Sequence, residues 1–208
     1  MGAQLALIPR SDVEIIPDFW LLPNFLTSTR QEALVKLIRE RCPKGWSTPT
    51  MPDGTPFSVK IFCFGFEWSI RGYKPAVEPM IWDFSELALQ ALDMITARHQ
   101  TFIPQTAIIS HYGPNSKLGL HRDRQEDERL QLQGSPIVTV ALGDDCFFQV
   151  RNPTTNALHE FVMESGDCIV MHARSRLCEH GVKRIVPGSS PIAGLKGRLS
   201  ITIRQVHP

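Results

Sequence analysis

The sequence predicts an α+β protein that is mainly β, with an antiparallel sandwich, jelly roll or barrel in its C-terminal half. From residue 105 onward, short runs rich in Ile, Val and Phe follow one another, separated by Gly, Pro, Asn and Asp. No helix of convincing length separates these runs, which favours antiparallel pairing. Before residue 100, by contrast, two segments have the apolar periodicity of helices.

The composition is typical of one globular domain. The chain has 208 residues, of which 42% are hydrophobic and 21% charged, and its formal net charge of +1 neither favours nor excludes a nucleic-acid partner. Its five cysteines are odd in number and form no C-x-x-C pair, which argues against a disulfide framework or a zinc ribbon. Because no apolar run has the length of a membrane span, we expect a cytoplasmic monomer that does not contact a membrane.

The first expected helix lies in "TSTRQEALVKLIRERCP", residues 27–43. Thr29 and Glu32 have the spacing of a capping box, and Pro43 ends the apolar pattern. The segment "SELALQALDMITARHQ", residues 85–100, repeats this pattern. We interpret both as packing helices with no part in chemistry.

The segment between them, residues 51–79, is rich in Pro, Gly and aromatic residues, and predicts short strands and turns. Within it, Trp68 and Tyr73 flank Arg71, an arrangement that suits a planar ligand with a phosphate. The alternative is that these aromatic side chains belong to the core of a hairpin.

Six strands are expected in the β region, in "QTAIISHY", "SPIVTVAL", "CFFQV", "LHEFVM", "DCIVM" and "RLSITIRQ". Side chains alternate across a strand, so one face of the last is apolar and the other carries Arg198, Ser200, Thr202 and Arg204. Two guanidinium groups on one face suit a short diacid, because each binds a carboxylate bidentately. The alternative is an edge strand with solvated arginines.

A candidate metal site lies in the same region. "HYGPNSKLGLHRDRQEDE" contains His121 and Asp123, and "GDCIVMHARSRLCEHGV" supplies His180. Two imidazoles and one carboxylate make the facial triad of non-haem Fe(II) oxygenases, which leaves positions on the metal open. Taken alone, H-x-D is also typical of a charged surface turn.

In this order the segments "HYGPNSKLGLHRDRQEDE", "SPIVTVALGDDCFFQV", "SGDCIVMHARSRLCEHGV" and "GRLSITIR" resemble the AlkB family of 2-oxoglutarate- and Fe(II)-dependent dioxygenases. The resemblance is strong over residues 105–205, looser over 57–75, where it concerns the family's nucleotide-recognition lid, and slight before that. It implies a double-stranded β-helix (jelly roll) core. It also implies one domain made of an N-terminal extension and helix (1–50), a lid (51–80), a packing helix (81–104) and the dioxygenase core (105–208).

The resemblance implies that His121, Asp123 and His180 bind Fe(II). The cosubstrate 2-oxoglutarate would bind Arg198 through its distal carboxylate and Arg204 through the carboxylate beside the keto group, with Arg204 also counted among the catalytic residues. Three further side chains would contact the cosubstrate: Tyr112 through its hydroxyl, and Ser110 and Ser200, which stand where the family commonly has Asn.

Four residues are implied to contact the substrate. Trp68 would stack on the target base, Tyr73 would lie near the nucleic-acid backbone, and Arg151 would add a basic contact. Gln125 stands where the bacterial prototype has an Asp near the base, which leaves the base preference open.

The resemblance therefore implies an oxidative demethylase that removes N-alkyl lesions from bases of DNA, and of RNA as a second candidate. It would use Fe(II), 2-oxoglutarate and O2, release succinate, CO2 and formaldehyde, and act on single strands or flipped bases. Two alternatives stay open: the same oxygenase acting on a protein or small molecule, and a metal-binding β-barrel that recognises modified nucleic acid without turnover.

Overall fold

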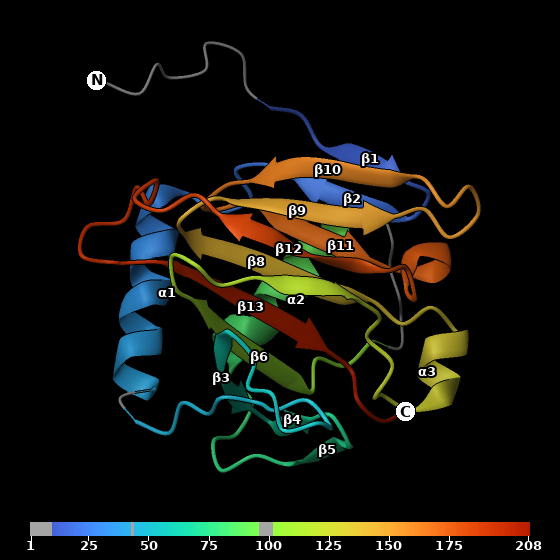
Figure 1. Ribbon diagram of the computed structural model, residues 1–208, viewed down its shortest axis with the longest axis horizontal. Coiled ribbons are helices and arrows are strands. Elements are labelled where there is room, and N and C mark those ends of the chain that lie inside the picture. Colours follow the sequence, from blue (N-terminus) through green and yellow to red (C-terminus); the bar gives the residue numbers. More distant parts are fainter. Residues whose placement is uncertain (1–9, 43, 96–101) are drawn as a thin grey trace.

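The computed structural model describes residues 10–42, 44–95 and 102–208 of the chain. Two antiparallel sheets face each other, and a separate hairpin lies below them in the view of Figure 1. The larger sheet has the strand order β1 (Val13–Ile16), β2 (Phe19–Leu22), β11 (Cys168–Met171), β8 (Ile137–Gly143), β13 (Arg198–Arg204), β6 (Thr106–Tyr112) and β3 (Val59–Phe64). The smaller sheet has the order β10 (Leu158–Met163), β9 (Cys146–Arg151), β12 (His180–Ile185) and β7 (Leu118–His121), and the hairpin is β4 (Phe66–Ser69) and β5 (Gly72–Pro75).

Two helices cover the outer face of the larger sheet. They are α1 (Ser28–Arg41) and α2 (Trp82–Met94), while a short helix α3 (Glu128–Leu132) and a 3-10 turn (Ala173–Ser175) lie near the ends of strands. Leu34 and Ile38 of α1, Phe84 and Leu87 of α2 and Ile201 of β13 are all buried in one cluster. A second apolar cluster fills the space between the sheets, so the predicted packing role of the helices is confirmed.

The start of α1 differs from the prediction. Thr27, not Thr29, is the N-cap, and its side-chain oxygen accepts a hydrogen bond from the backbone N–H of Arg30 at 3.3 Å. The predicted capping box of Thr29 and Glu32 is therefore wrong, because Thr29 already lies inside the helix. The second helix begins at Trp82, and residues 96–100 of its predicted segment lie outside the described residues.

All six predicted strands are present, and so are short strands and turns in residues 51–79. The structure adds β1, β2, β7 and β12, which are not among the predicted strands. It also shows that β3, from the predicted lid segment, pairs with β6 at the edge of the larger sheet. Of the segment predicted as a lid, the β4–β5 hairpin, called the lid hairpin below, lies outside the two large sheets, whereas β3 is part of the larger one.

The strand β13 lies inside the larger sheet, between β8 and β6. Its residues Leu199, Ile201 and Ile203 pack toward the helices. The opposite face, which carries the two arginines, points into the space between the sheets, as the alternation predicts. This excludes the edge-strand interpretation.

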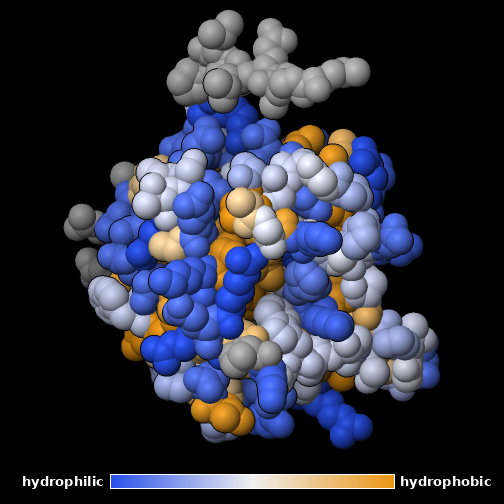
Figure 2. Space-filling view, turned by 90° about the vertical axis from the view of Figure 1, so that its left-hand side faces the viewer, coloured by the Kyte–Doolittle hydropathy of each residue, from blue (hydrophilic) through white to orange (hydrophobic). Residues whose placement is uncertain are grey.

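The side of the molecule on which α1 lies has a mostly hydrophilic surface (Figure 2). Among the described residues, no helix is both long and apolar enough to span a bilayer.

Candidate active site

Three side chains that can bind a metal ion meet where β7 pairs with β12. His121 ends β7 and His180 begins β12, and the two lie opposite each other with their ring centroids 4.6 Å apart. Asp123 follows β7, with its carboxylate oxygens 3.7 Å from Nε2 of His121 and 3.5 Å from Nε2 of His180. One potential ligand atom from each residue lies within 4.8 Å of the others, and the described part of the chain contains no second cluster of this kind.

The backbone determines which imidazole nitrogen faces the cluster. Nδ1 of His121 lies 2.9 Å from the carbonyl oxygen of Gly119, and Nδ1 of His180 lies 3.2 Å from that of Cys178. When the proton of a neutral imidazole is on Nδ1 and is donated to a carbonyl oxygen, the lone pair of Nε2 is free to bind a metal. Two imidazoles and one carboxylate fit Fe(II), so the predicted set is well placed for it.

The electrostatics keep the carboxylate of this cluster ionised. Burial alone would raise the pKa of Asp123, but Arg204 and the two histidines outweigh it and hold this pKa well below its usual range. Burial also lowers the pKa of His121, and the neighbouring His180 adds to the effect. In His180 burial is outweighed by hydrogen bonds to Asp123 and Cys178, which raise its pKa to about 9, so a bound metal ion would replace the proton on Nε2 of this residue.

A narrow cavity of about 80 Å³ runs between the sheets beside the metal cluster. It brings together all the residues that were predicted for metal and cosubstrate, namely Ser110, Tyr112, His121, Asp123, His180, Arg198, Ser200 and Arg204. Two of them lie opposite each other, because Ser200 of β13 pairs with Ser110 of β6. Burial raises the pKa of the Tyr112 hydroxyl, so this group stays a neutral hydrogen-bond donor.

Arg198 is suited to bind an anionic ligand in this cavity. Its side chain is buried, and its Nη1 donates to the backbone oxygens of Asp144 at 3.1 Å and Met163 at 3.2 Å. Its Nε has no partner, and no carboxylate of the described residues forms an ion pair with it. A buried guanidinium without a counterion is costly, and the carboxylate of 2-oxoglutarate would supply the missing charge.

Arg204 has a different environment, which the sequence did not predict. Its Nη2 lies 2.8 Å from Asp123, and its Nη1 lies 2.8 Å from Glu126 and donates to the Tyr73 hydroxyl at 2.9 Å. Glu126 also binds Arg176, whose side chain is fully enclosed. No sequence pattern indicates that these two residues are buried partners. Glu126 stands among other charged residues in "RQEDER", and Arg176 stands in "HARSRLCEH".

A wider pocket of about 510 Å³ adjoins the metal cluster. His121, Asp123 and Arg204 line it together with Trp68 and Gln125, so these two predicted substrate residues do face a common space. The Trp68 ring packs at 6.2 Å from the Phe57 ring, and its buried Nε1 has no hydrogen-bond partner.

The other two predicted substrate residues do not line this pocket. The Tyr73 hydroxyl turns inward and donates to Glu126 at 2.8 Å. Arg151 binds Glu179 at 3.0 Å, and it is Glu179 that lines the pocket, together with Arg122.

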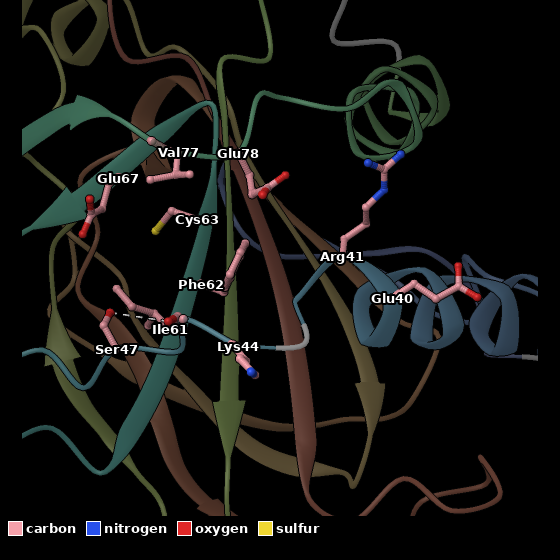
Figure 3. A pocket seen from close by; sticks show the side chains of 12 residues that line it. Glu40, Arg41, Lys44, Ser47, Ile61, Phe62, Cys63, Glu67, Val77 and Glu78 are labelled. Carbon is pink, nitrogen blue, oxygen red and sulfur yellow. Dashed lines mark hydrogen bonds between the residues drawn. The ribbon is translucent and has the colours of Figure 1, made fainter.

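A third cavity, of about 540 Å³, lies outside this site (Figure 3). It lies beside the edge strand β3 and the end of α1, and its charged lining residues are Glu40, Arg41, Lys44, Glu67 and Glu78. It contains none of the residues predicted for metal, cosubstrate or substrate.

Comparison with known proteins agrees with this geometry. A family model described as the 2OG-Fe(II) oxygenase superfamily matches residues 18–204. An alpha-ketoglutarate-dependent dioxygenase AlkB homolog of Caulobacter vibrioides is 30% identical, over 99% of this chain and 94% of its own length. A DNA N(6)-methyladenine demethylase of Arabidopsis thaliana, ALKBH1D, is 28% identical over 91% of this chain, which spans about half (50%) of that relative.

The fold has a counterpart among solved structures. The structure of OsALKBH1 superposes with a TM-score of 0.81 at 27% identity, and the match covers 93% of this chain and 99% of that one. This confirms the expected jelly-roll core. Since one family model spans most of the chain and an AlkB homologue aligns with it almost from end to end, the protein belongs to the AlkB family within the 2OG-Fe(II) oxygenase superfamily.

Proposed function

We propose that this protein is an oxidative demethylase that removes N-alkyl groups from nucleic-acid bases with Fe(II), 2-oxoglutarate and O2. One observation carries the proposal: residues of the metal cluster line two pockets of different character. The narrow cavity is also lined by the buried cation of Arg198, and the wider pocket is also lined by Trp68. A diacid in the first and a planar base in the second can therefore both lie next to one metal ion.

Bound iron would supply the chemistry that couples decarboxylation of 2-oxoglutarate to succinate and CO2 with insertion of one oxygen atom of O2 into the N-alkyl group, which leaves as formaldehyde. The side chains of this protein orient the two reactants. Arg198 and Tyr112 bind one end of the cosubstrate, and Arg204 binds the end nearest the metal. Trp68 and His121 flank the base, and the lid hairpin that carries Trp68 excludes water from the site.

The charges of the wider pocket favour a base that is uncharged. Among the described residues that line it, the carboxylates are Asp123, which pairs with Arg204, and Glu179, which pairs with Arg122 and Arg151. Gln125 is neutral, so no unpaired carboxylate is left to stabilise a cationic base that is methylated on a ring nitrogen. A base methylated on its exocyclic nitrogen stays neutral, and we propose this class as the preferred substrate.

Access to the pocket requires an exposed base, so the proposed substrate is single-stranded DNA or RNA, or a duplex with the base flipped out.

That the protein acts as a cytoplasmic monomer remains a prediction. The same holds for its division into an N-terminal extension, lid, packing helix and core.

The test is turnover with a methylated single-stranded oligonucleotide, measured as succinate and formaldehyde release in the presence of Fe(II), 2-oxoglutarate and air. The matched control is the double variant His121→Ala, Asp123→Ala. We expect release that depends on the methyl group, is absent from the control, and is faster for N6-methyladenine than for 3-methylcytosine. Succinate release that ignores every oligonucleotide would redirect the search to a protein or small-molecule substrate. No turnover of any keto acid would contradict the proposal.

A further inference from the structure

Four charged side chains form a buried cluster between the metal site and the lid hairpin: Asp123, Glu126, Arg176 and Arg204. Their side chains are 7%, 0%, 2% and 8% exposed, respectively. Two carboxylates face two guanidinium groups, so the formal charges balance. This balance matters because a buried charge without a partner is strongly destabilising.

Glu126 is the carboxylate that both arginines share. One of its oxygens lies 2.8 Å from Nη1 of Arg204, and the other lies 2.9 Å from Nη2 of Arg176. Arg176 also donates from Nη1 to the backbone oxygen of Asp123 at 2.7 Å. Arg176 thus ties Glu126 to the backbone of a metal-binding residue.

Arg204 has two anionic partners, and a metal ion would compete for one of them. The carboxylate of Asp123 lies 2.8 Å from Nη2 of Arg204 and is also the carboxylate of the metal cluster. When Asp123 binds a divalent cation, its charge is shared, and Arg204 is left beside that cation with Glu126 as its remaining full partner.

We propose that Glu126, held by Arg176, is a positioning residue. It keeps Arg204 paired and in place while Asp123 binds the metal, so that Nη2 of Arg204 is free for the carboxylate of 2-oxoglutarate. The inference rests on the metal and cosubstrate sites of the proposed function. Glu126 and Arg176 act here through Arg204 and Asp123, without touching the metal or the substrate themselves.

The variant Glu126→Gln keeps the size of the side chain and removes its charge. Asp123 is then the only carboxylate paired with Arg204, so metal binding must break this one ion pair, and we expect the affinity for Mn(II) to fall roughly 10- to 100-fold. Saturating 2-oxoglutarate supplies a carboxylate beside Arg204, and we expect it to restore most of the lost affinity. A residue that merely shapes the site would show the same loss with and without the cosubstrate.

The experiment is a calorimetric titration of Mn(II) into the metal-free protein, with and without 2-oxoglutarate, accompanied by thermal melts. The matched control is Asp167→Asn, which also alters a fully enclosed carboxylate paired with an arginine, Arg10 at 2.7 Å, outside the site. We expect this control to lower the melting temperature and leave the Mn(II) affinity unchanged. Arg176→Lys keeps the charge and loses one of two hydrogen bonds, so it should show the same pattern in weaker form even if Glu126→Gln does not fold.

An unchanged Mn(II) affinity in both site variants, or a loss that 2-oxoglutarate does not reverse, overturns the inference. A failure of the proposed function would look different, because the wild-type protein itself would then bind no 2-oxoglutarate in the presence of Mn(II).

Discussion

Replacement of Arg198 by Met separates the cosubstrate site from the stability of the fold. The Arg198 side chain is 1% exposed and, within the described residues, forms no ion pair; Asp145 interacts with its charge from a greater distance. Its protein contacts are the backbone oxygens of Asp144 and Met163. Methionine has a similar reach and no charge, so Arg198→Met should lose affinity for 2-oxoglutarate while the protein still folds.

The size of both effects follows from these contacts. A bidentate pair with a carboxylate consists of two charge-assisted hydrogen bonds, each worth about 1.5–3 kcal/mol. Since each 1.4 kcal/mol is about a factor of ten, the affinity for 2-oxoglutarate should fall roughly 100-fold or more. For the fold, losing two hydrogen bonds of about 1 kcal/mol each is offset by removing a buried cation that forms no direct ion pair, so the free energy of unfolding should change by less than about 2 kcal/mol.

The assay is a titration of 2-oxoglutarate into Mn(II)-loaded protein, with urea unfolding of the metal-free protein as the measure of stability. Arg129→Met is the matched control, because that arginine is exposed and pairs with Asp127. An Arg198→Met protein that binds 2-oxoglutarate within about threefold of the wild type would refute the assignment, because threefold is less than one hydrogen bond to a charged group.

Three further predictions concern other parts of the molecule. Trp68→Ala should weaken binding of a methylated single-stranded oligonucleotide by about 1–3 kcal/mol in fluorescence anisotropy and leave 2-oxoglutarate affinity unchanged; loss of both would show that Trp68 supports the whole site. Gly181→Ala would place a Cβ atom 2.5 Å from the carbonyl oxygen of Leu118, forcing β12 away from β7, so unfolding should become easier by about 1–3 kcal/mol and Mn(II) binding should weaken. If the Gly181→Ala variant bound Mn(II) as tightly as the wild type, the predicted displacement of β12 from β7 would be wrong. Burial raises the pKa of the Cys168 thiol well above its usual value, so this thiol stays protonated in the folded protein but ionises above about pH 8.5 once unfolded. Its contribution to stability is therefore complete below that pH and is lost above it at about 1.4 kcal/mol per pH unit. We measure the free energy of unfolding by urea titration at a series of pH values. Above about pH 8.5, Cys168→Ala should reduce the decline of this free energy with pH by that amount. Equal slopes for the variant and the wild type would disprove the assignment.

The candidate site was predictable where its signal is local. The alternation of side chains along β13 placed Arg198 and Arg204 on one face, and the close spacing of His121 and Asp123 put them at one strand end. Such relations depend on the backbone geometry of a few successive residues. The start of α1 shows the limit of this approach, because Thr27 and Thr29 both precede an apolar periodic run and only the turn of the chain decides which one caps the helix.

The sequence by itself determined the mainly β class, the six strands of the β region, the three residues of the candidate metal cluster and the face on which the two arginines lie. These features follow from periodicity and residue chemistry within short segments. The tertiary structure decided that β1, β2 and β3 join the jelly-roll sheet, and that Tyr73 turns away from the pocket toward Arg204. It also decided that Glu126 meets Arg176, which lies 50 positions further along the chain. No local pattern encodes such a pair, because two buried charges become partners only when the packing of distant segments excludes water around both.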